Sequence, residues 1–300
     1  MPQQFKSVAL SSLRGLYAGC RRLPLPLPLR RTGSRVFDWA YRYALPSVPY
    51  LVRSNGHAMF VNPLDRDISR QITLRGDYEP GKKRAFLGCL KKGMTVLDIG
   101  ANMGDYTLVA ARTVREEGAV YAFEPDPVNF ALLLKNVSLG GYKNITCVRK
   151  ALSNSPGLCN LYLDKHNLGC HSLCSANTYT QASSANVETD TIDSFVSSLP
   201  GRRVDFLKID AQGAEGLILE GAADTLARHN ITIFAEFWPW GLLNMGTDPG
   251  AFLDKLKLLG YEIRLIPDDG PPSALPEDFH TLCSSSCDRG YHVDLLFSKP

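Results

Sequence analysis

The sequence predicts an α/β fold with a Rossmann-like, mostly parallel sheet and helices on both of its faces. The first observation is the stretch Thr95–Tyr106, TVLDIGANMGDY, in which a short apolar run enters a glycine-containing loop and a helical pattern follows. The second is the regular alternation of strand-like and helix-like segments from Met94 onward. The third is that the strand-like segments are nearly continuously apolar, as in strands buried on both faces.

The elements of this sheet follow in order along residues 93–300, which we expect to form the main domain. Bounded apolar runs predict strands, and apolar residues three or four apart predict helices. A polar stretch at about 154–192 breaks the rhythm and predicts an insertion. The last two strands are expected to form an antiparallel C-terminal pair. The predicted strands are 95–99, 119–123, 145–148, 158–163, 187–192, 204–209, 231–237, 262–265 and 292–297, and the predicted helices are 104–115, 127–139, 214–228 and 249–259.

Two segments precede this domain. Residues 37–92 predict a small extension, with a strand at 57–61, a short helix at 65–73 and a helical stretch through Phe86, Leu87 and Leu90. Residues 1–36 predict a basic, disordered arm, because they carry seven Lys and Arg and no Asp or Glu. Prolines alternate within 23–29, which favours an extended chain over a helix.

Composition limits the classes of function. The chain of 300 residues is 44% hydrophobic, enough for a substantial core, and its net charge of +3 does not by itself indicate a nucleic-acid partner. No apolar run is long enough to span a bilayer, so we expect a cytoplasmic protein without a transmembrane segment. The basic arm leaves organelle targeting or contact with a membrane surface as alternatives. The oligomeric state stays open.

The cysteines offer one alternative chemistry. Eight cysteines without a secretory signal are most simply reduced thiols. Two pairs with three intervening residues, together with neighbouring histidines, form a loose zinc-like pattern, although zinc sites usually have tighter spacing. We therefore expect no metal; the residues of the pattern are Cys170, Cys174, Cys283, Cys287, His171, His280 and His292.

The glycine loop predicts the kind of ligand. Gly100 and Gly104 let the backbone approach a ligand closely, and the helix that follows favours an anionic group. Asp98, inside the strand end, would repel a dinucleotide pyrophosphate but suits a ligand with an ammonium and a sulfonium. S-adenosylmethionine is such a ligand. The GxGxxG fingerprint is absent, which disfavours a dehydrogenase.

Acids end several of the predicted strands. Asp98, Glu124 and Asp210 lie at three strand ends, and Glu236 lies near a fourth. Ligands of open α/β sheets bind beyond the carboxyl ends of the strands, so these side chains are expected to share one site. Glu124, at the end of the second strand, is placed to bind a ribose diol.

Several motifs together resemble those of the FkbM-type methyltransferases. They occur in order, with similar spacing, over roughly residues 76–265. This resemblance implies a Rossmann-like class I methyltransferase that uses S-adenosylmethionine, usually to O-methylate sugars, polyketides or other secondary metabolites. The family commonly has Asp-Val-Glu-Gly after the fourth core strand, whereas this chain has Asp-Ala-Gln-Gly, so Gln212 removes one charge. The motifs are VLDIGANMG (96–104), VYAFEPDP (120–127), KALS (150–153), HSL (171–173) and FLKIDAQGAE (206–215).

The cofactor's chemistry assigns expected binding roles. Asp98 would hold the ammonium, and Glu124 the ribose. The backbone of Ala151 would contact the adenine. Tyr106 would face the sulfonium by a cation–π interaction or pack in its helix. The methionine end would lie against the loop residues Gly100, Asn102 and Gly104.

Transfer to a hydroxyl group also needs a base. Asp210 is the first candidate, since it lies where the acceptor should approach. His171 is the second, and Glu215 and Glu236 stand behind them; Glu215 also suits the first turn of a helix as a dipole partner. The aromatic cluster at 237–240, FWPW, is interpreted equally well as the lining of an acceptor pocket and as core packing.

Two other functions remain as alternatives. Methylation of protein or nucleic acid is one, although DNA amino-methylating enzymes typically carry Asn-Pro-Pro-Tyr where this chain has DAQG, and the core has no basic aromatic stripe. A non-catalytic, cofactor-binding scaffold protein is the other. We expect the partner to be a small-molecule or glycan acceptor, and no nucleic acid.

Overall fold

The fold is that of a computed structural model, which describes residues 14, 15, 17, 27–199, 201, 203–276, 279 and 289–300, with the backbone alone at residues 27–35 and 182. Contacts within the chain divide it into two units, Met1–Tyr78 and Glu79–Pro300. The larger unit carries the predicted sheet.

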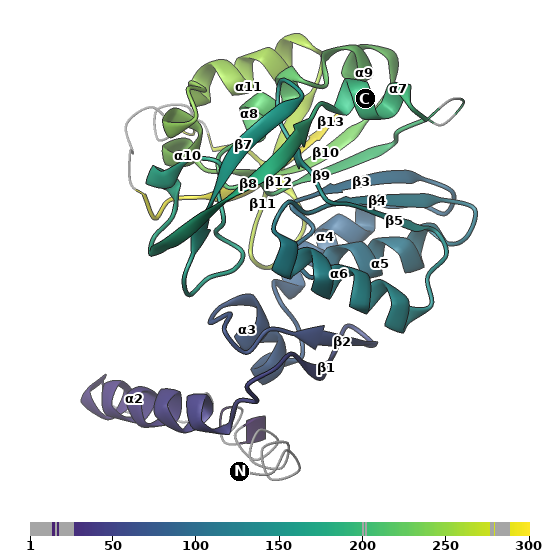
Figure 1. The fold of residues 1–300 in the computed structure, drawn as a ribbon. Helices are drawn as coiled ribbons and strands as arrows, with labels where there is room; N and C mark the ends of the chain where they lie inside the picture. Colours follow the sequence, from purple (N-terminus) through teal and green to yellow (C-terminus); the bar gives the residue numbers. More distant parts are fainter. Residues whose placement is uncertain are drawn as a thin grey trace. The chain divides into compact units, whose positions relative to one another are not determined.

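Eight strands, counted over the described part of the chain, form the central sheet (Figure 1). Five adjacent strands pair in parallel with one another. The strand β13 (Val293–Ser298) is antiparallel to both of its neighbours. The predicted mostly parallel sheet and the antiparallel C-terminal pair are confirmed. From edge to edge the strands are β12 (Ser273–Ala274), β11 (Glu262–Ile266), β13 (Val293–Ser298), β10 (Thr232–Phe237), β9 (Phe206–Ile209), β3 (Thr95–Ile99), β4 (Ala119–Phe123) and β5 (Ile145–Val148).

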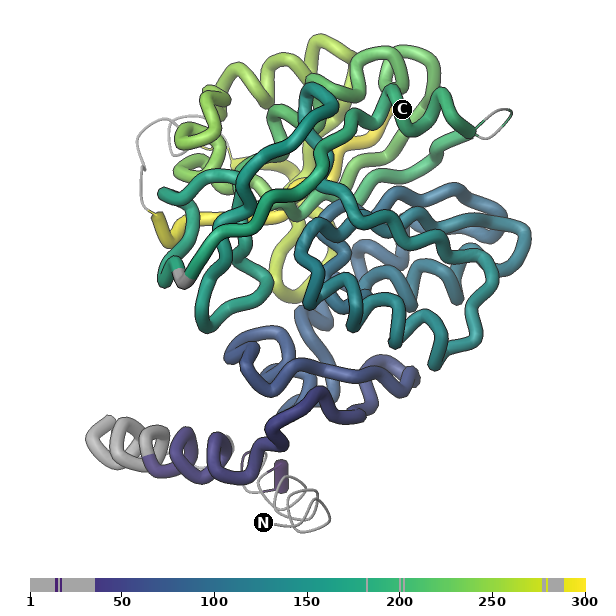
Figure 2. The backbone as a smooth tube through the Cα atoms, viewed as in Figure 1, coloured from purple at the N-terminus to yellow at the C-terminus, as the bar shows by residue number. Residues whose placement is uncertain are grey.

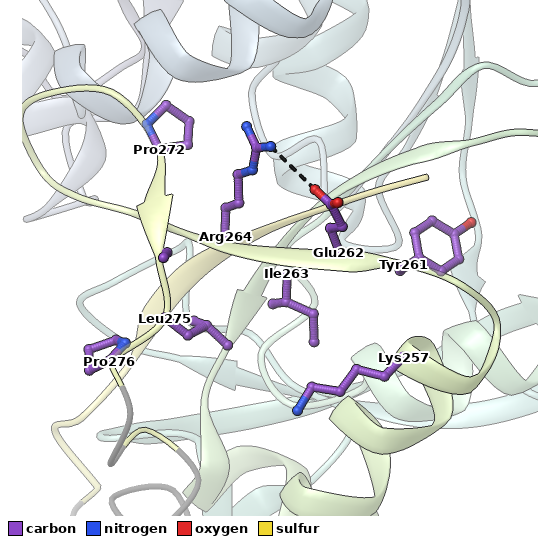
Figure 3. A pocket seen from close by; sticks show the side chains of 9 residues that line it. Lys257, Tyr261, Glu262, Ile263, Arg264, Pro272, Leu275 and Pro276 are labelled. Atoms are coloured by element: carbon purple, nitrogen blue, oxygen red, sulfur yellow. Dashed lines mark hydrogen bonds and ion pairs between the residues drawn. The ribbon is translucent and has the colours of Figure 1, made fainter. Parts of the chain in front are cut away.

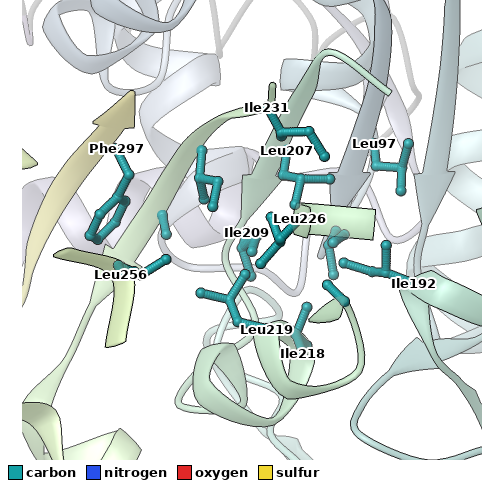
Figure 4. Close-up of a cluster of buried hydrophobic side chains, with 14 of the residues drawn as sticks. Leu97, Ile192, Leu207, Ile209, Ile218, Leu219, Leu226, Ile231, Leu256 and Phe297 are labelled. Atoms are coloured by element: carbon teal, nitrogen blue, oxygen red, sulfur yellow. The ribbon is translucent and has the colours of Figure 1, made fainter. Parts of the chain in front are cut away.

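Helices cover both faces of this sheet, as predicted (Figure 1). Strand side chains alternate between the two faces, so Leu97 and Leu207 join the largest hydrophobic cluster, together with Ile218 and Leu226 from helices on that face (Figure 4). On one face lie α4 (Pro80–Cys89), α5 (Asp105–Val114) and α6 (Pro127–Gly140); on the other lie α8 (Glu215–Glu220), α9 (Ala223–Arg228) and α11 (Pro249–Leu258), while α10 (Pro239–Asn244) follows β10.

The single helix predicted at 214–228 is wrong, because the structure has two short helices there, α8 and α9. The break falls at Gly221 and Ala222. A Cβ atom on Gly221 would lie only 2.2 Å from the carbonyl oxygen of Ser153, so the chain passes too close to the segment at Ser153 and Asn154 for a side chain. This contact between distant segments ends α8.

The predicted insertion forms a small sheet of its own, and Figure 2 shows its chain folding back on itself. In it β7 (Gly157–Asp164) and β8 (Gln181–Asp190) are antiparallel, and β6 (Ala151–Leu152) is parallel to β8. The 3-10 turn η1 (Ser175–Asn177) lies between β7 and β8. The strand predicted at 187–192 ends at Asp190, because Thr191 caps α7 (Ile192–Ser197), its hydroxyl accepting from Ser194 N at 3.0 Å.

The smaller unit contains the strand and the short helix predicted for the extension. Its elements are α2 (Leu27–Ala44), β1 (Tyr50–Ser54), β2 (His57–Val61) and α3 (Ile68–Arg75), with β1 and β2 antiparallel. The extended conformation predicted for 23–29 is wrong at 27–29, where α2 begins; residues 23–26 lie outside the described residues. Pro28 falls in the first helical turn, where no backbone N–H is needed, so a proline is tolerated there.

Among the described residues, no helix has both the length and the apolarity that crossing a bilayer requires.

Candidate active site

The glycine loop that follows β3 is shaped by close packing. Gly100 has a φ of +75°, and a Cβ atom there would lie 1.9 Å from the carbonyl oxygen of Asp210. Gly104 has a φ of +96°, and a Cβ atom would lie 2.8 Å from Leu133 Cδ1. Glycine is therefore required at both positions. The loop after β3 and the loop after β9 touch through their backbones.

Glu124, at the end of β4, is bonded to two loops. One carboxylate oxygen accepts from Asn102 N at 2.8 Å, and the other accepts from Asp126 N at 2.9 Å. Burial raises the pKa of Glu124 to about 8. Asn102, with a φ of +51°, also donates from its side chain to the carbonyl of Leu168 in the insertion, at 3.2 Å. Glu124 thus holds the glycine loop against the next strand end.

Asp98 is fully buried within β3 and has internal partners. The hydroxyl of Thr107, on α5, donates to one carboxylate oxygen at 2.5 Å. The other oxygen lies 3.4 Å from Lys208 Nζ and has no hydrogen-bond partner among the described residues. Asp98 is therefore buried next to the glycine loop, and its second oxygen interacts with the Lys208 ammonium by charge alone.

Lys208 is a buried cation that the sequence analysis missed. It lies directly opposite Asp98 in the pairing of β3 with β9 and is 4% exposed. Its Nζ donates to Gly100 O at 3.0 Å, lies 3.8 Å from Asp210 Oδ2 and stands 5.3 Å from the centre of the Tyr106 ring. Burial alone would lower the pKa of Lys208, but the Asp98 and Asp210 carboxylates raise it above its ordinary value. The ammonium therefore stays charged.

Asp210 stands at the end of β9 and is accessible, with 43% of its side chain exposed. Gln212, which has a φ of +53°, donates from its amide nitrogen to Asp210 and to Glu236, at 3.1 Å in each case. Burial and the carboxylates of Asp210 and Glu215 raise the pKa of Glu236 well above its ordinary value. The amide of Gln212 thus separates two acids at the same edge of the sheet.

Glu215 braces the loop that carries Asp210. It is fully buried, and one carboxylate oxygen accepts from Ala211 N at 2.9 Å and from Gly213 N at 3.3 Å. Burial raises the pKa of Glu215 to about 7. Its contacts are with the backbone below Asp210.

His171 and Asp210 have different neighbours. The Nδ1 atom of His171 accepts from Asp164 N at 3.0 Å, so the neutral ring carries its proton on Nε2. Burial lowers the pKa of His171, and the charges of Asp126 and Asp164 oppose this. These acids lie in the insertion and after β4. The structure therefore groups His171 with the β4 end of the sheet.

Side chains of the insertion hydrogen-bond to the backbone of the loop that carries Asp210. The carbonyl of Gln212 accepts from Ser172 Oγ at 2.8 Å and from Asn177 Nδ2 at 2.9 Å. Ala151, at the start of β6, is buried and pairs with Thr189. The insertion therefore contacts both the glycine loop, through Leu168, and the loop after β9, through Ser172 and Asn177.

The aromatic cluster after β10 divides between two environments. Phe237 is fully buried in the core, and Trp238 is buried and donates from its indole to Arg289 O at 2.9 Å. Both therefore serve packing. Trp240 is half-buried, and its indole N–H has no partner in the described part of the structure.

Tyr106, on α5, packs edge-on against Phe86, with ring centres 5.2 Å apart, and donates to Glu79 at 3.3 Å.

Other candidate sites lie apart from these residues. No group of three or more His, Cys, Asp or Glu side chains arranged to hold a metal ion occurs in the described ranges; Cys283, Cys287 and His280 fall outside them. A cavity of about 720 Å³ lies beside β11 at the sheet's edge, lined by residues such as Tyr261, Arg264 and Leu275 (Figure 3). It shares no lining residue with the acids at the strand ends.

Comparison with known proteins finds similarity to methyltransferases. A model of the methyltransferase FkbM domain matches residues 98–263. The FkbM methyltransferase structure from Methylobacillus flagellatus is 14% identical, with a TM-score of 0.45; the alignment covers 77% of this chain and 52% of that one. A precorrin-6y C5,15-methyltransferase from Geobacter metallireducens is 12% identical, with a TM-score of 0.41, covering 73% and 87%. A search of curated proteins found no match.

Proposed function

The chain belongs to the FkbM methyltransferase family, whose methyl donor is S-adenosylmethionine, and we propose that it O-methylates a hydroxyl group of a sugar, a glycan or a secondary metabolite. Its fold is that of a Rossmann-like class I methyltransferase.

One observation carries the proposal. The carboxyl ends of β3, β4 and β9, adjacent strands in the sheet, bring the glycine loop, Glu124 and Asp210 to one edge. The carbonyl of Asp210 packs directly against Gly100, and Glu124 accepts from the backbone of the same loop. A donor on the glycine loop would therefore lie beside an accessible carboxylate.

The charges at this edge fit a cationic nucleoside. The Lys208 ammonium lies beside both Asp98 and Asp210, so the site has excess negative charge, and Glu124 adds to it when it is ionised. The sulfonium and ammonium of S-adenosylmethionine supply the complementary charge, and the sulfonium activates its methyl group for displacement. Asp98 acts on this cation by charge through the loop, because its side chain is fully buried.

Different residues bind the methionine end, the ribose and the adenine of the cofactor. Gly100, Asn102 and Gly104 form the cradle for the methionine end, where the absence of side chains on the two glycines permits close approach. Glu124 binds the ribose hydroxyls with the lone pairs that Asn102 and Asp126 leave free. Ala151 contacts the adenine through its backbone.

Asp210 is the proposed general base. Methyl transfer is an in-line displacement, so the protein chiefly aligns the acceptor oxygen with the methyl carbon. As the new C–O bond forms and the C–S bond breaks, the hydroxyl proton passes to the Asp210 carboxylate, leaving S-adenosylhomocysteine and the methyl ether. The Gln212 amide donates to this carboxylate, and the Lys208 ammonium lies 3.8 Å from its other oxygen. Glu236, which accepts from the same Gln212 amide, is a second carboxyl group next to Asp210.

His171 and Glu215 take supporting positions in this proposal. Glu215 holds the backbone of the loop that carries Asp210. His171 uses Nδ1 to accept from the backbone, so its Nε2–H is a donor to the acceptor or the cofactor rather than a base. Trp240, with its indole N–H unpaired among the described residues, is the member of the aromatic cluster that we assign to the acceptor.

Calorimetry tests the cofactor assignment. We expect micromolar binding of S-adenosylmethionine to the full chain, and a loss of at least tenfold in affinity in Glu124→Ala, because the variant loses the hydrogen bonds to both ribose hydroxyls, roughly 0.5–1.5 kcal/mol each. Absence of binding by folded wild-type protein contradicts the enzyme proposal and favours a scaffold protein.

Label transfer tests the acceptor. Methyl-labelled cofactor is incubated with the protein and with fractions of a cell extract separated into small molecules, glycans, protein and nucleic acid. Label is expected in the first two fractions, and Asp210→Asn should reduce its transfer at least a hundredfold. Label in protein or nucleic acid would support the alternative methyltransferase class instead.

A further inference from the structure

The smaller unit exposes an apolar face on the helix α2. The opposite face of this helix is covered: Tyr41 and Ala44 are buried, and the hydroxyl of Tyr41 lies 3.5 Å from that of Tyr50. The guanidinium of Arg70 lies over the Tyr41 ring, 5.5 Å from its centre, and pairs with Asp38. These contacts fix which face of α2 looks outward.

The outward face of α2 consists of Val36, Trp39 and Tyr43, which are 62%, 70% and 62% exposed. Their spacing of three and four residues places them in one stripe. The rings of Trp39 and Tyr43 stack on each other, with centres 5.8 Å apart. Single exposed apolar residues are ordinary, but three exposed side chains in one stripe on a helix, two of them aromatic, form a surface that favours a partner.

Charge distinguishes the kind of partner. Residues 1–35 carry seven Lys and Arg and no acid, and the exposed Arg42 lies next to the stripe. The unit Met1–Tyr78 has a net charge of +8, whereas Glu79–Pro300 has a net charge of −5. A second copy of the same face would therefore be repelled, and an anionic surface would be attracted.

We propose that the face formed by Val36, Trp39 and Tyr43 binds the surface of an anionic phospholipid membrane, with α2 lying in the plane of the interface. Trp and Tyr are the side chains that favour the boundary between headgroups and acyl chains, and a valine adds apolar area beneath it. Arg42 and the cations that precede the stripe in the sequence bind the negative headgroups. This inference does not depend on the proposed methyl transfer.

Vesicle sedimentation tests the proposal with the full-length chain. We expect the protein to sediment with vesicles of equimolar phosphatidylcholine and phosphatidylserine and not with pure phosphatidylcholine vesicles. The variants Trp39→Ala and Tyr43→Ala should each lower partitioning by about tenfold, because the apolar and electrostatic contributions are both needed for stable binding. Added salt should weaken binding by screening the cations.

Tryptophan fluorescence gives a second, site-specific readout. The chain has three tryptophans, and Trp39 is far more exposed than Trp238 or Trp240. Anionic vesicles should shift the emission to the blue, and lipids brominated on their acyl chains should quench it. Trp39→Phe should lose the shift but retain sedimentation, since phenylalanine keeps the aromatic area.

Leu64→Ser supplies the matched control. Leu64 is also 70% exposed and lies in the same unit, but outside α2, so this variant should bind vesicles like the wild type. Circular dichroism confirms that each variant is folded. Equal binding to both vesicle types, no binding to either, or unchanged binding by Trp39→Ala and Tyr43→Ala would each overturn the proposal. So would binding of homopolymeric RNA that depends on Trp39 and is stronger than vesicle binding.

Discussion

At the scale of single residues, Lys208 supplies a buried positive charge beside two acids of the site, Asp98 and Asp210. A lysine is almost never buried without a partner, and this one neutralises Asp98 and approaches Asp210 while donating to the glycine loop. Its position inside a short apolar strand, after Leu207 and before Ile209, was a visible signal. The identity of its partners was not, because they come from another strand and from the next loop.

Replacing Lys208 by Met should change the preference for charge in the cofactor. Without the ammonium the site is more negative, so S-adenosylmethionine should gain affinity relative to S-adenosylhomocysteine, which lacks the sulfonium charge. We expect the ratio of the two dissociation constants to shift by about fivefold, equivalent to roughly 1 kcal/mol of Coulomb energy. Calorimetry with both ligands measures it. Lys208→Arg keeps the charge and should leave the ratio unchanged; an unchanged ratio in folded Lys208→Met would argue against this role.

Glu215 should make stability depend on pH. Its pKa of about 7 in the folded protein lies above its ordinary value of 4.5, so the folded state binds more protons in that interval. Stability is then fully present at low pH and falls as pH rises from about 4.5 towards 7. Between about pH 5 and pH 8, wild-type protein should lose roughly 2 kcal/mol more than Glu215→Gln, as measured by urea unfolding. Parallel slopes for the two proteins would contradict the assignment.

At the scale of elements, the glycine loop and the loop after β9 form one unit. Gly100 is needed because the Asp210 backbone occupies the space of a side chain, and Gly213 is equally confined, with a Cβ position 2.4 Å from Asn177 Nδ2. The insertion, through Asn177, thus packs on the loop that follows β9. Strand, loop and insertion therefore fix the position of Asp210 together.

Gly100→Ala should destabilise the protein far more than the matched variant Gly93→Ala. Both glycines have positive φ, +75° and +84°, but only Gly100 faces an obstruction, whereas nothing lies within 4 Å of a Cβ atom on Gly93. We expect a loss of about 1–2 kcal/mol for Gly93→Ala from the backbone conformation alone, and at least about 4 kcal/mol for Gly100→Ala. Urea unfolding compares them. Equal losses would mean that the two loops separate easily.

The helical elements show where local rules were overruled. Prolines at 24, 26 and 28 predicted an extended chain, yet α2 begins at Leu27, because a proline in the first turn forfeits no hydrogen bond. The pattern at 214–228 predicted one helix, yet contact with Ser153 at Gly221 divides it. Both errors concern the ends of helices. There, contacts with distant segments and the few backbone hydrogen bonds that a terminal turn needs decide the boundary more than the apolar periodicity does.

At the scale of the whole molecule, ligand binding should stabilise the fold. The residues that we propose to bind the cofactor come from separate segments of the larger unit, so only the folded state assembles them. A ligand at about a hundred times its dissociation constant adds about 2.7 kcal/mol. S-adenosylmethionine should therefore raise the melting temperature of the wild type by several degrees, and of Glu124→Ala by much less. A rise of the same size in the variant would place the ligand elsewhere.

The sequence by itself determined the architecture and the family. The strands at 95–99, 119–123 and 145–148 occur with the predicted bounds, because short apolar runs between turn residues leave few alternatives to buried parallel strands. The ordered motifs identified the FkbM methyltransferases, and the family model confirms this.

Only the tertiary structure decided how the acids are partnered. It places Lys208 opposite Asp98, sets Gln212 between Asp210 and Glu236, and separates the contacts of His171 from those of Asp210. The physical reason is that a strand's own sequence fixes its burial, whereas the charge state of a buried group depends on atoms brought to within a few ångströms by neighbouring strands and by the insertion.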